Sequence, residues 1–336
     1  MNARTHTTRF APLRAHFAAA LAAACALGAA APAHAQEYPT KGPIRLVVGF
    51  ATGGGTDAIA RSLNVRLAEV LKQSVIVENR PSSGGILGTD AVAKAAPDGY
   101  TVSFNVNTHA INQALYPKLP YDTERDLRGV TLIGSLGQTF AAHPNAEANT
   151  LQQFLKLEPA AENKKRILAN GGVGSPGHLA AAYLESIAGV KFTHVPYRGA
   201  GPGITDVLGG QVPYIYSTTA GLLPHIRSGR LKAIAISSPE RSPLMPNVPT
   251  IAESGFPGYD MDTWIGMFVP KATPNAVVKV LHEAVIEALK SPAVRERIEA
   301  QAGRIIGGSP EALDALVHED IKRYTKIVRD FGIKAE

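Results

Sequence analysis

The chain has 336 residues, of which 45% are hydrophobic, and its formal net charge at pH 7 is +6. A length of about 300 residues after removal of a leader exceeds what one hydrophobic core usually organises, so two domains are expected. The positive charge is spread without a Lys/Arg block, and this excludes the basic stripe typical of nucleic-acid-binding proteins.

The first segment predicts a cleavable signal peptide over residues 1–35. Arginines precede an apolar run from Phe17 to Ala31, and Ala33-His34-Ala35 supplies the small-x-small pattern that signal peptidase needs. The mature chain is expected to begin near Gln36. No later stretch approaches the roughly 20 apolar residues that a membrane span requires, so we expect an exported chain without a membrane helix.

Cysteine chemistry is not expected in the exported part, because the only cysteine, Cys25, lies inside the signal peptide. Cys25 could alternatively be a lipid attachment site. Ala22-Ala23-Ala24 lacks the leucine usual before such a cysteine, and the cleavage pattern at residues 33–35 competes with it, so release by cleavage is the preferred interpretation.

Strands and helices alternate from Ile44 onwards. The patterns predict strand Ile44–Phe50, helix Asp57–Lys72, strand Ser74–Glu78, helix Thr89–Ala95 and strand Tyr100–Asn107. Largely apolar strands joined by helices are typical of a parallel sheet covered on both faces.

A second set of alternating elements follows. It comprises helix Leu151–Leu157, strand Arg166–Ala169, helix His178–Ile187, strand Phe192–Val195, helix Gly203–Leu208, strand Val212–Ser217 and strand Leu231–Ser237. A proline-rich loop comes next, and helices Pro274–Lys290 and Pro310–Phe331 close the sequence.

Two long apolar segments, Gly129–Pro144 and Met261–Pro270, predict strands that pass from one domain to the other. The predicted domains are residues 36–137 plus 263–336, and residues 138–262. Two crossings make a hinge, and a cleft between lobes joined in this way is suited to closing over a small ligand.

The stretch "GFATGGGTDAIARSL" (49–63) contains the most conspicuous glycine turn. Its spacing nearly fits a P-loop, but Gly55 stands where the lysine should be, so nucleotide binding is not expected there. A second glycine turn, "GVGSPG" (172–177), formally matches a dinucleotide fingerprint, yet no acidic residue for a ribose follows. The sequence therefore predicts no nucleotide cofactor.

The physical properties of these turns still favour an anion. The first N–H groups of the helix near Thr56 and Asp57 have no partner within the helix and present partial positive charge. Gly174–His178 repeats the arrangement, with Ser175 as a hydroxyl donor. We therefore expect a carboxylate between two helix starts, one in each domain.

Simpler interpretations remain open for each of these residues. The glycines can serve only tight strand-to-helix turns, Asp57 can act as a helix cap, and His178 can be an ordinary residue of a first turn. Tyr197 in "VPYRGAGP" can either pack within its domain or line the pocket.

Catalytic and metal-binding patterns are absent from the sequence. The histidines of the mature chain are scattered without an H-E-x-x-H pair, so no metal site is predicted. Ser175 is preceded by Val173 where a nucleophile elbow requires glycine. We expect a protein that is not an enzyme, with an exported hydrolase as a minor alternative.

Several longer stretches identify a family. They are "YPTKGPIRLVVGFATGGGTD", "VIVENRPSSGGILGTDAVAKAAPDGYT", "NTHAINQALYPKLPYDTERDL", "HVPYRGAGPGITDVLGGQV", "LPHIRSGRLKAIAISSPERSPLMPNVPTIAESGFPGY" and "VRDFGIKAE". With these stretches in this order, the chain resembles the extracytoplasmic solute-binding proteins of tripartite tricarboxylate transporters, the Bug family.

The resemblance implies a type II periplasmic binding protein, an α/β fold of two domains with a central cleft and two crossing strands as hinge. It implies capture of a small organic acid in the periplasm by a monomer, delivery to the permease subunits of a membrane transporter, and no reaction. A sensory protein of the same fold that signals to a receptor kinase is the alternative. The ligand-binding residues expected from the resemblance and from the helix starts are Phe50, Thr52, Gly53, Gly54, Gly55, Thr56, Asp57, Asn107, Thr108, His109, Gly174, Ser175, Gly177, His178, Tyr197, Ser217 and Thr218.

Two departures from the family pattern affect these expectations. Gly49 stands where relatives usually have proline, and we expect it to loosen the turn. The strand that begins at Pro213 ends in Ser217, Thr218 and Thr219, where relatives place an acidic residue or Asn. A neutral, hydroxyl-rich wall disfavours a ligand amino group and favours a di- or tricarboxylate or an aromatic acid.

Overall fold

The computed structural model of the protein describes residues 38–50, 52, 55–157, 166–197 and 199–334. Contacts divide the chain into two units, Met1–Thr40 and Lys41–Glu336, and every strand and helix considered below lies in the second. The predicted signal peptide, Gly53 and Gly54 lie outside the described residues. Within the described ranges, no helix combines the length and apolar character needed to cross a membrane.

Six strands form the first sheet, here called sheet A, in the order β11-β4-β10-β3-β1-β2. The strands are β1 (Ile44–Val48), β2 (Val75–Asn79), β3 (Thr101–Val106), β4 (Leu127–Leu136), β10 (Thr263–Pro270) and β11 (Gly303–Gly308). The first three are parallel to one another, whereas β10 is antiparallel to β3 and β4, and β11 is antiparallel to β4. The helices that follow or cover these strands are α2 (Gly55–Leu71), α3 (Ile86–Ala93), α4 (Thr108–Leu115), α5 (Thr123–Asp126), α10 (Asn275–Ala288), α11 (Pro292–Glu299) and α12 (Pro310–Asp330).

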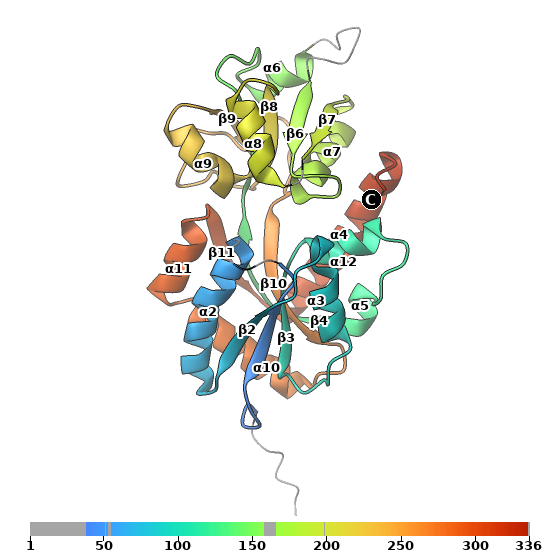
Figure 1. Ribbon diagram of the computed structural model, residues 1–336, viewed down its shortest axis with the longest axis vertical. Coiled ribbons are helices and arrows are strands. Elements are labelled where there is room, and N and C mark those ends of the chain that lie inside the picture. The colour runs from blue at the N-terminus through green and yellow to red at the C-terminus, as the bar shows by residue number, and fades with distance from the viewer. Residues whose placement is uncertain (1–37, 51, 53–54, 158–165, 198, 335–336) are drawn as a thin grey trace, which may run out of the picture. The chain divides into compact units, whose positions relative to one another are not determined.

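Five strands form the second sheet, sheet B, in the order β7-β6-β8-β5-β9 (Figure 1). They are β5 (Gln138–Ala142), β6 (Ile167–Asn170), β7 (Thr193–Pro196), β8 (Tyr214–Thr218) and β9 (Lys232–Ile236). β6 is parallel to both β7 and β8, and β5 is antiparallel to β8 and β9. The accompanying helices are α6 (Leu151–Lys156), α7 (Pro176–Ala188), α8 (Ala200–Leu208) and α9 (Thr219–Arg227). The expected α/β fold is confirmed.

The chain passes twice between the sheets. β4 of sheet A is followed by β5 of sheet B after the single residue Gly137, and residues 237–262 lead from β9 back to β10. Asp262 fastens the second passage to the first, because its carboxylate accepts hydrogen bonds from Ser135 Oγ (3.2 Å), from Ser238 Oγ (3.0 Å) and from Ser237 Oγ. Burial raises the pKa of Asp262 to about 6.

Some elements are not evident in the sequence pattern. The structure adds α4, α5, α9, α11 and β11 to the predicted elements. Local composition explains the omissions: α9 contains Pro224, β11 contains Gly303, Gly307 and Gly308 in six residues, and α11 buries only Val294 and Ile298. In these three elements, tertiary packing outweighs the weak local preference of the sequence for a helix or a strand.

The core of sheet B is aromatic. Phe140 in the middle of β5 is completely buried, and its ring centroid lies 4.7 Å from that of Phe154, 5.9 Å from that of Tyr214 and 6.0 Å from that of Tyr216. Phe140 and Phe154 belong to a single cluster of buried apolar residues that also contains Phe268 of sheet A. The two sheets therefore share one continuous apolar interior.

Replacing the central aromatic side chain tests this interior. We expect Phe140→Ala to lower the free energy of unfolding by about 3–5 kcal/mol, because it removes buried apolar contacts and leaves a cavity. Urea unfolding followed by circular dichroism measures the change. Val65→Ala, at a side chain that is 61% exposed, is the control and should shift stability by less than about 0.5 kcal/mol. Equal effects of the two substitutions would contradict the assignment of Phe140 to the core.

Candidate functional site

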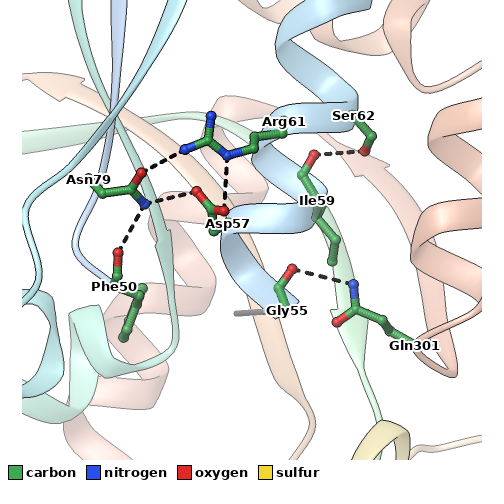
Figure 2. A network of polar contacts seen from close by, with 8 residues as sticks. All are labelled: Phe50, Gly55, Asp57, Ile59, Arg61, Ser62, Asn79 and Gln301. Atoms are coloured by element: carbon green, nitrogen blue, oxygen red, sulfur yellow. Dashed lines mark hydrogen bonds and ion pairs between the residues drawn. The ribbon is translucent and has the colours of Figure 1, made fainter. Parts of the chain in front are cut away.

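A ring of polar contacts holds the two ends of the first glycine turn. Figure 2 shows Asn79, the last residue of β2, donating from Nδ2 to Phe50 O (3.0 Å) and to Asp57 Oδ1 (2.9 Å). Arg61 donates to Asn79 Oδ1 (2.9 Å) and from Nε to Asp57 Oδ2 (3.0 Å). The buried carboxylate of Asp57 therefore ties the start of α2 to β2 through Asn79, and Asn79 also holds the segment after β1 at Phe50.

The remaining predicted residues of this turn lie at the start of α2. Gly55 is the first residue of the helix, and its carbonyl accepts a hydrogen bond from Gln301 Nε2 (3.3 Å). Thr56 is half-buried and Thr52 is exposed. The described residues Gly55 and Thr56 thus lie at the start of α2, beyond the carboxyl end of β1, which is the end at which parallel sheets bind ligands.

Gly49 has a packing role that the sequence did not indicate. A Cβ atom on Gly49 would lie only 2.6 Å from Gly85 Cα, and one on Gly88 would lie 2.9 Å from Gly49 Cα. Backbones that approach so closely need glycine at the contact. Gly49 therefore permits tight packing of the end of β1 against the segment that begins α3.

Three helices start at one edge of sheet B. The parallel strands β6, β7 and β8 all end there, and each is followed within a few residues by α7, α8 or α9. A cavity of about 190 Å³ lies at this edge. It is lined by Gln138, Gly171, Ser175, Pro176, Gly177, Ala200, Tyr216, Ser217 and Thr218. The predicted residues Ser175, Gly177, Ser217 and Thr218 are thereby brought together.

The start of α7 is built to expose donors to this cavity. Ser175 is the N-cap, and its Oγ accepts a hydrogen bond from His178 N (3.3 Å), which leaves the hydroxyl proton free to be donated. Pro176 at the first helical position has no N–H. A Cβ on Gly177 would lie 2.5 Å from Tyr216 O, so only glycine lets the helix start approach β8 this closely.

His178 and Tyr197 hold the loops instead of lining this cavity. His178 Nδ1 accepts a hydrogen bond from Gly174 N (3.1 Å), and its ring centroid lies 4.8 Å from that of His194. Burial, together with the smaller effect of the neighbouring His194, lowers the pKa of His178 to about 4. Tyr197 donates from its hydroxyl to Asp206 Oδ2 (2.7 Å). Both side chains fix the backbone around the helix starts.

The predicted turn Asn107–His109 is the beginning of helix α4. Asn107 donates from Nδ2 to the hydroxyl of Tyr324 (3.2 Å), while its Oδ1 and the Oγ1 of Thr108 are buried without a hydrogen-bond partner among the described residues. His109 is buried with its ring centroid 4.1 Å from that of Phe268, and burial lowers its pKa to about 3. His109 borders a different, smaller cavity together with Phe268.

Sequence reasoning missed two side chains of the cavity at sheet B. Gln138 begins β5 and Tyr216 lies in β8, both within apolar stretches that indicate only buried strands. The sequence offers one signal for Gln138. It is a polar residue within the apolar segment Gly129–Pro144, at the point where the chain passes from sheet A to sheet B. In the described part of the chain, no three His, Cys, Asp or Glu side chains are grouped so as to bind a metal ion.

The comparison with known protein families agrees with this geometry. Residues 59–333 match the family described as tripartite tricarboxylate transporter family receptor. The chain belongs to this family. The resemblance to Bug proteins is confirmed as well: the chain is 35% identical over 309 residues to protein BugT of Bordetella pertussis, with 91% of this chain and 94% of BugT covered.

Solved structures of receptors in this group have the same fold. MatC from Rhodopseudomonas palustris, solved with bound malate, is 33% identical, with a TM-score of 0.71 and coverage of 85% of this chain and 98% of MatC. Another R. palustris protein, solved with adipate, is 28% identical, with a TM-score of 0.75 and coverage of 89% and 99%. Malate and adipate are both small carboxylates.

The buried His178 makes stability depend on pH. Its pKa of about 4 in the folded chain lies below the ordinary value of 6.5, so unfolding takes up a proton between these pH values. The stability that the neutral ring contributes is present above pH 6.5 and is lost as the pH falls toward 4. His178→Asn retains an acceptor for Gly174 N but cannot titrate. Near pH 5, we expect unfolding of the native sequence to take up about one proton more than unfolding of His178→Asn. The free energy of unfolding of the native sequence should therefore rise with pH more steeply than that of the variant, by about 1.4 kcal/mol per pH unit.

Urea titrations of both proteins at several pH values between 4.5 and 7.5 measure this difference in slope. Identical slopes would show that His178 is protonated equally in the folded and unfolded chains.

Proposed function

We propose that the protein is an exported receptor that binds one small carboxylate and releases it unchanged to a membrane permease. The chief support is the cavity at the starts of α7 and α8. Its lining combines hydroxyl groups and helix-start amides, and none of the described residues that border it carries an ionisable acid or base of the kind needed for proton transfer at neutral pH.

A carboxylate suits this lining better than other small groups. Helix starts carry partial positive charge and unpartnered N–H groups, and hydroxyl protons can complete the hydrogen bonding of an anionic oxygen. The malate and adipate bound to the two related proteins support the same class of ligand for this chain. The neutral wall formed by Ser217 and Thr218 further favours a ligand without an amino group.

We extend the proposal to the way the ligand is enclosed. Residues 36–137 plus 263–336 would form one domain and residues 138–262 the other, joined at Gly137 and at the segment fastened by Asp262. Ser175, Gly177, Ser217 and Thr218 would contact the ligand from one domain. From the other, the ligand would be met by the glycine turn from Phe50 to Asp57 and by the unpartnered oxygens of Asn107 and Thr108.

The same proposal covers the cellular setting. Residues 1–35 would direct export to the periplasm, where the mature monomer would pass its ligand to permease subunits. Deletion of the gene in its host should abolish uptake of the labelled acid, and expression of the chain without residues 1–35 should not restore it. Unchanged uptake after deletion would refute the proposed role in transport. It would not contradict binding of the acid by the chain.

Ser175→Ala tests the site. Loss of the cap should cost about 1 kcal/mol of stability, and loss of the hydroxyl donor should weaken carboxylate binding about tenfold. A thermal-shift screen over organic acids, amino acids and aromatic acids identifies the ligand first, and calorimetry then measures the affinity of each variant.

Ser309→Ala is the matched control. Ser309 caps α12 as Ser175 caps α7, since its Oγ accepts from Ala312 N (3.2 Å) and a proline follows it. It should cost similar stability and leave affinity unchanged. Equal weakening by both substitutions, or tight binding of glutamate with no affinity for plain carboxylic acids, would refute the proposed site.

A further inference from the structure

Gln138 occupies the point where the cavity at sheet B meets both passages between the sheets. It is the first residue of β5, directly after Gly137, and its side chain is 1% exposed. Its backbone N–H donates to Ser237 Oγ (2.9 Å), and Ser237 in turn donates to Asp262. Its side-chain Nε2 donates to Thr263 Oγ1 (2.7 Å) at the start of β10. The side chain is therefore held in one place.

The amide oxygen of this side chain lacks a donor, although the residue borders the cavity. With the nitrogen assigned to Thr263, Oε1 is buried and has no hydrogen-bond partner among the described residues. Gln138 lines the cavity together with Ser175 and Gly177. A buried carbonyl oxygen left without a donor is destabilising, so a donor is expected at this point when the site is filled.

We propose that Gln138 selects ligands that carry a hydroxyl group beside the carboxylate. The proposal rests on the carboxylate-binding function proposed above. The carboxylate would lie at the start of α7, where donors converge, and a hydroxyl on the adjacent carbon would donate to Oε1 of Gln138. The site would then prefer 2-hydroxy acids to the same acids without the hydroxyl group.

A hydroxyl fits this position better than an ammonium group. Either could donate to Oε1, but no described residue that borders the cavity is acidic, and the helix starts around it carry partial positive charge. An ammonium group would therefore lie buried without a counter-charge. A neutral hydroxyl supplies the missing hydrogen bond without that cost.

Matched ligands test the preference on the native sequence. Succinate, malate and aspartate share one carbon skeleton and carry hydrogen, hydroxyl and ammonium at the same carbon, and glutarate with 2-hydroxyglutarate forms a second pair. Calorimetry should show each hydroxy acid binding about tenfold more tightly than its parent acid, and aspartate binding more weakly than malate.

Equal affinities within each pair would overturn the inference, because Oε1 of Gln138 would then not accept a hydrogen bond from the ligand hydroxyl. Either a water molecule would supply the donor, or the side-chain amide would be rotated so that its nitrogen takes the place of Oε1. Tighter binding of aspartate than of malate would also overturn it. Absence of binding by every acid in the thermal-shift screen would instead reject the proposed function itself, so the two failures are distinguishable.

Gln138→Met provides the second test. Methionine has similar volume and no acceptor at this position, so the ratio between hydroxy acid and parent acid should fall to about one, mainly through weaker binding of the hydroxy acid. Gln152→Met, the same change at an exposed position on α6, should keep the ratio of the native sequence. A ratio that persists in Gln138→Met would assign the selectivity to another residue.

Discussion

The first amide groups of a helix have no partner within the helix, and this requirement organises the candidate site. In sheet B, three parallel strands end at one edge, so the starts of α7, α8 and α9 come together there. The sequence supplies only partial compensation: Ser175 caps α7, and Pro176 removes one N–H. The partial positive charge of these helix starts lies beside the cavity, where we propose that an anion binds.

The passage between the sheets imposes a second constraint. Two chain segments that join two parts of a protein must be tied together if both are to move as one hinge. Asp262 does this by accepting hydrogen bonds from Ser135 and from the two serines that follow β9. Gln138 adds a link from this network to the cavity. The contacts that join the two passages are thus continuous with the lining of the cavity that we propose as the ligand site.

Much of this arrangement follows from sequence, and the exceptions have physical causes. The αβ alternation and the glycine turns predicted both sheets and the helix start at Ser175, because apolar periodicity and capping are local signals. His178 and Tyr197 could not be placed from sequence, since their ring directions depend on His194 and Asp206, which are distant along the chain or on another element. Gln138 was missed because its surroundings are apolar and its partners lie 99 and 125 residues away.

Trp264 gives these hinge contacts an optical consequence. It is the only tryptophan in the chain, it is buried in β10 directly after Thr263, and its indole N–H donates to Asp320 of α12 (2.7 Å). The one indole of the chain therefore lies one residue from the hydroxyl that accepts a hydrogen bond from Gln138. Its emission would follow rearrangement of the crossing segments without an attached dye, so the native chain carries its own reporter of the domain closure that we propose.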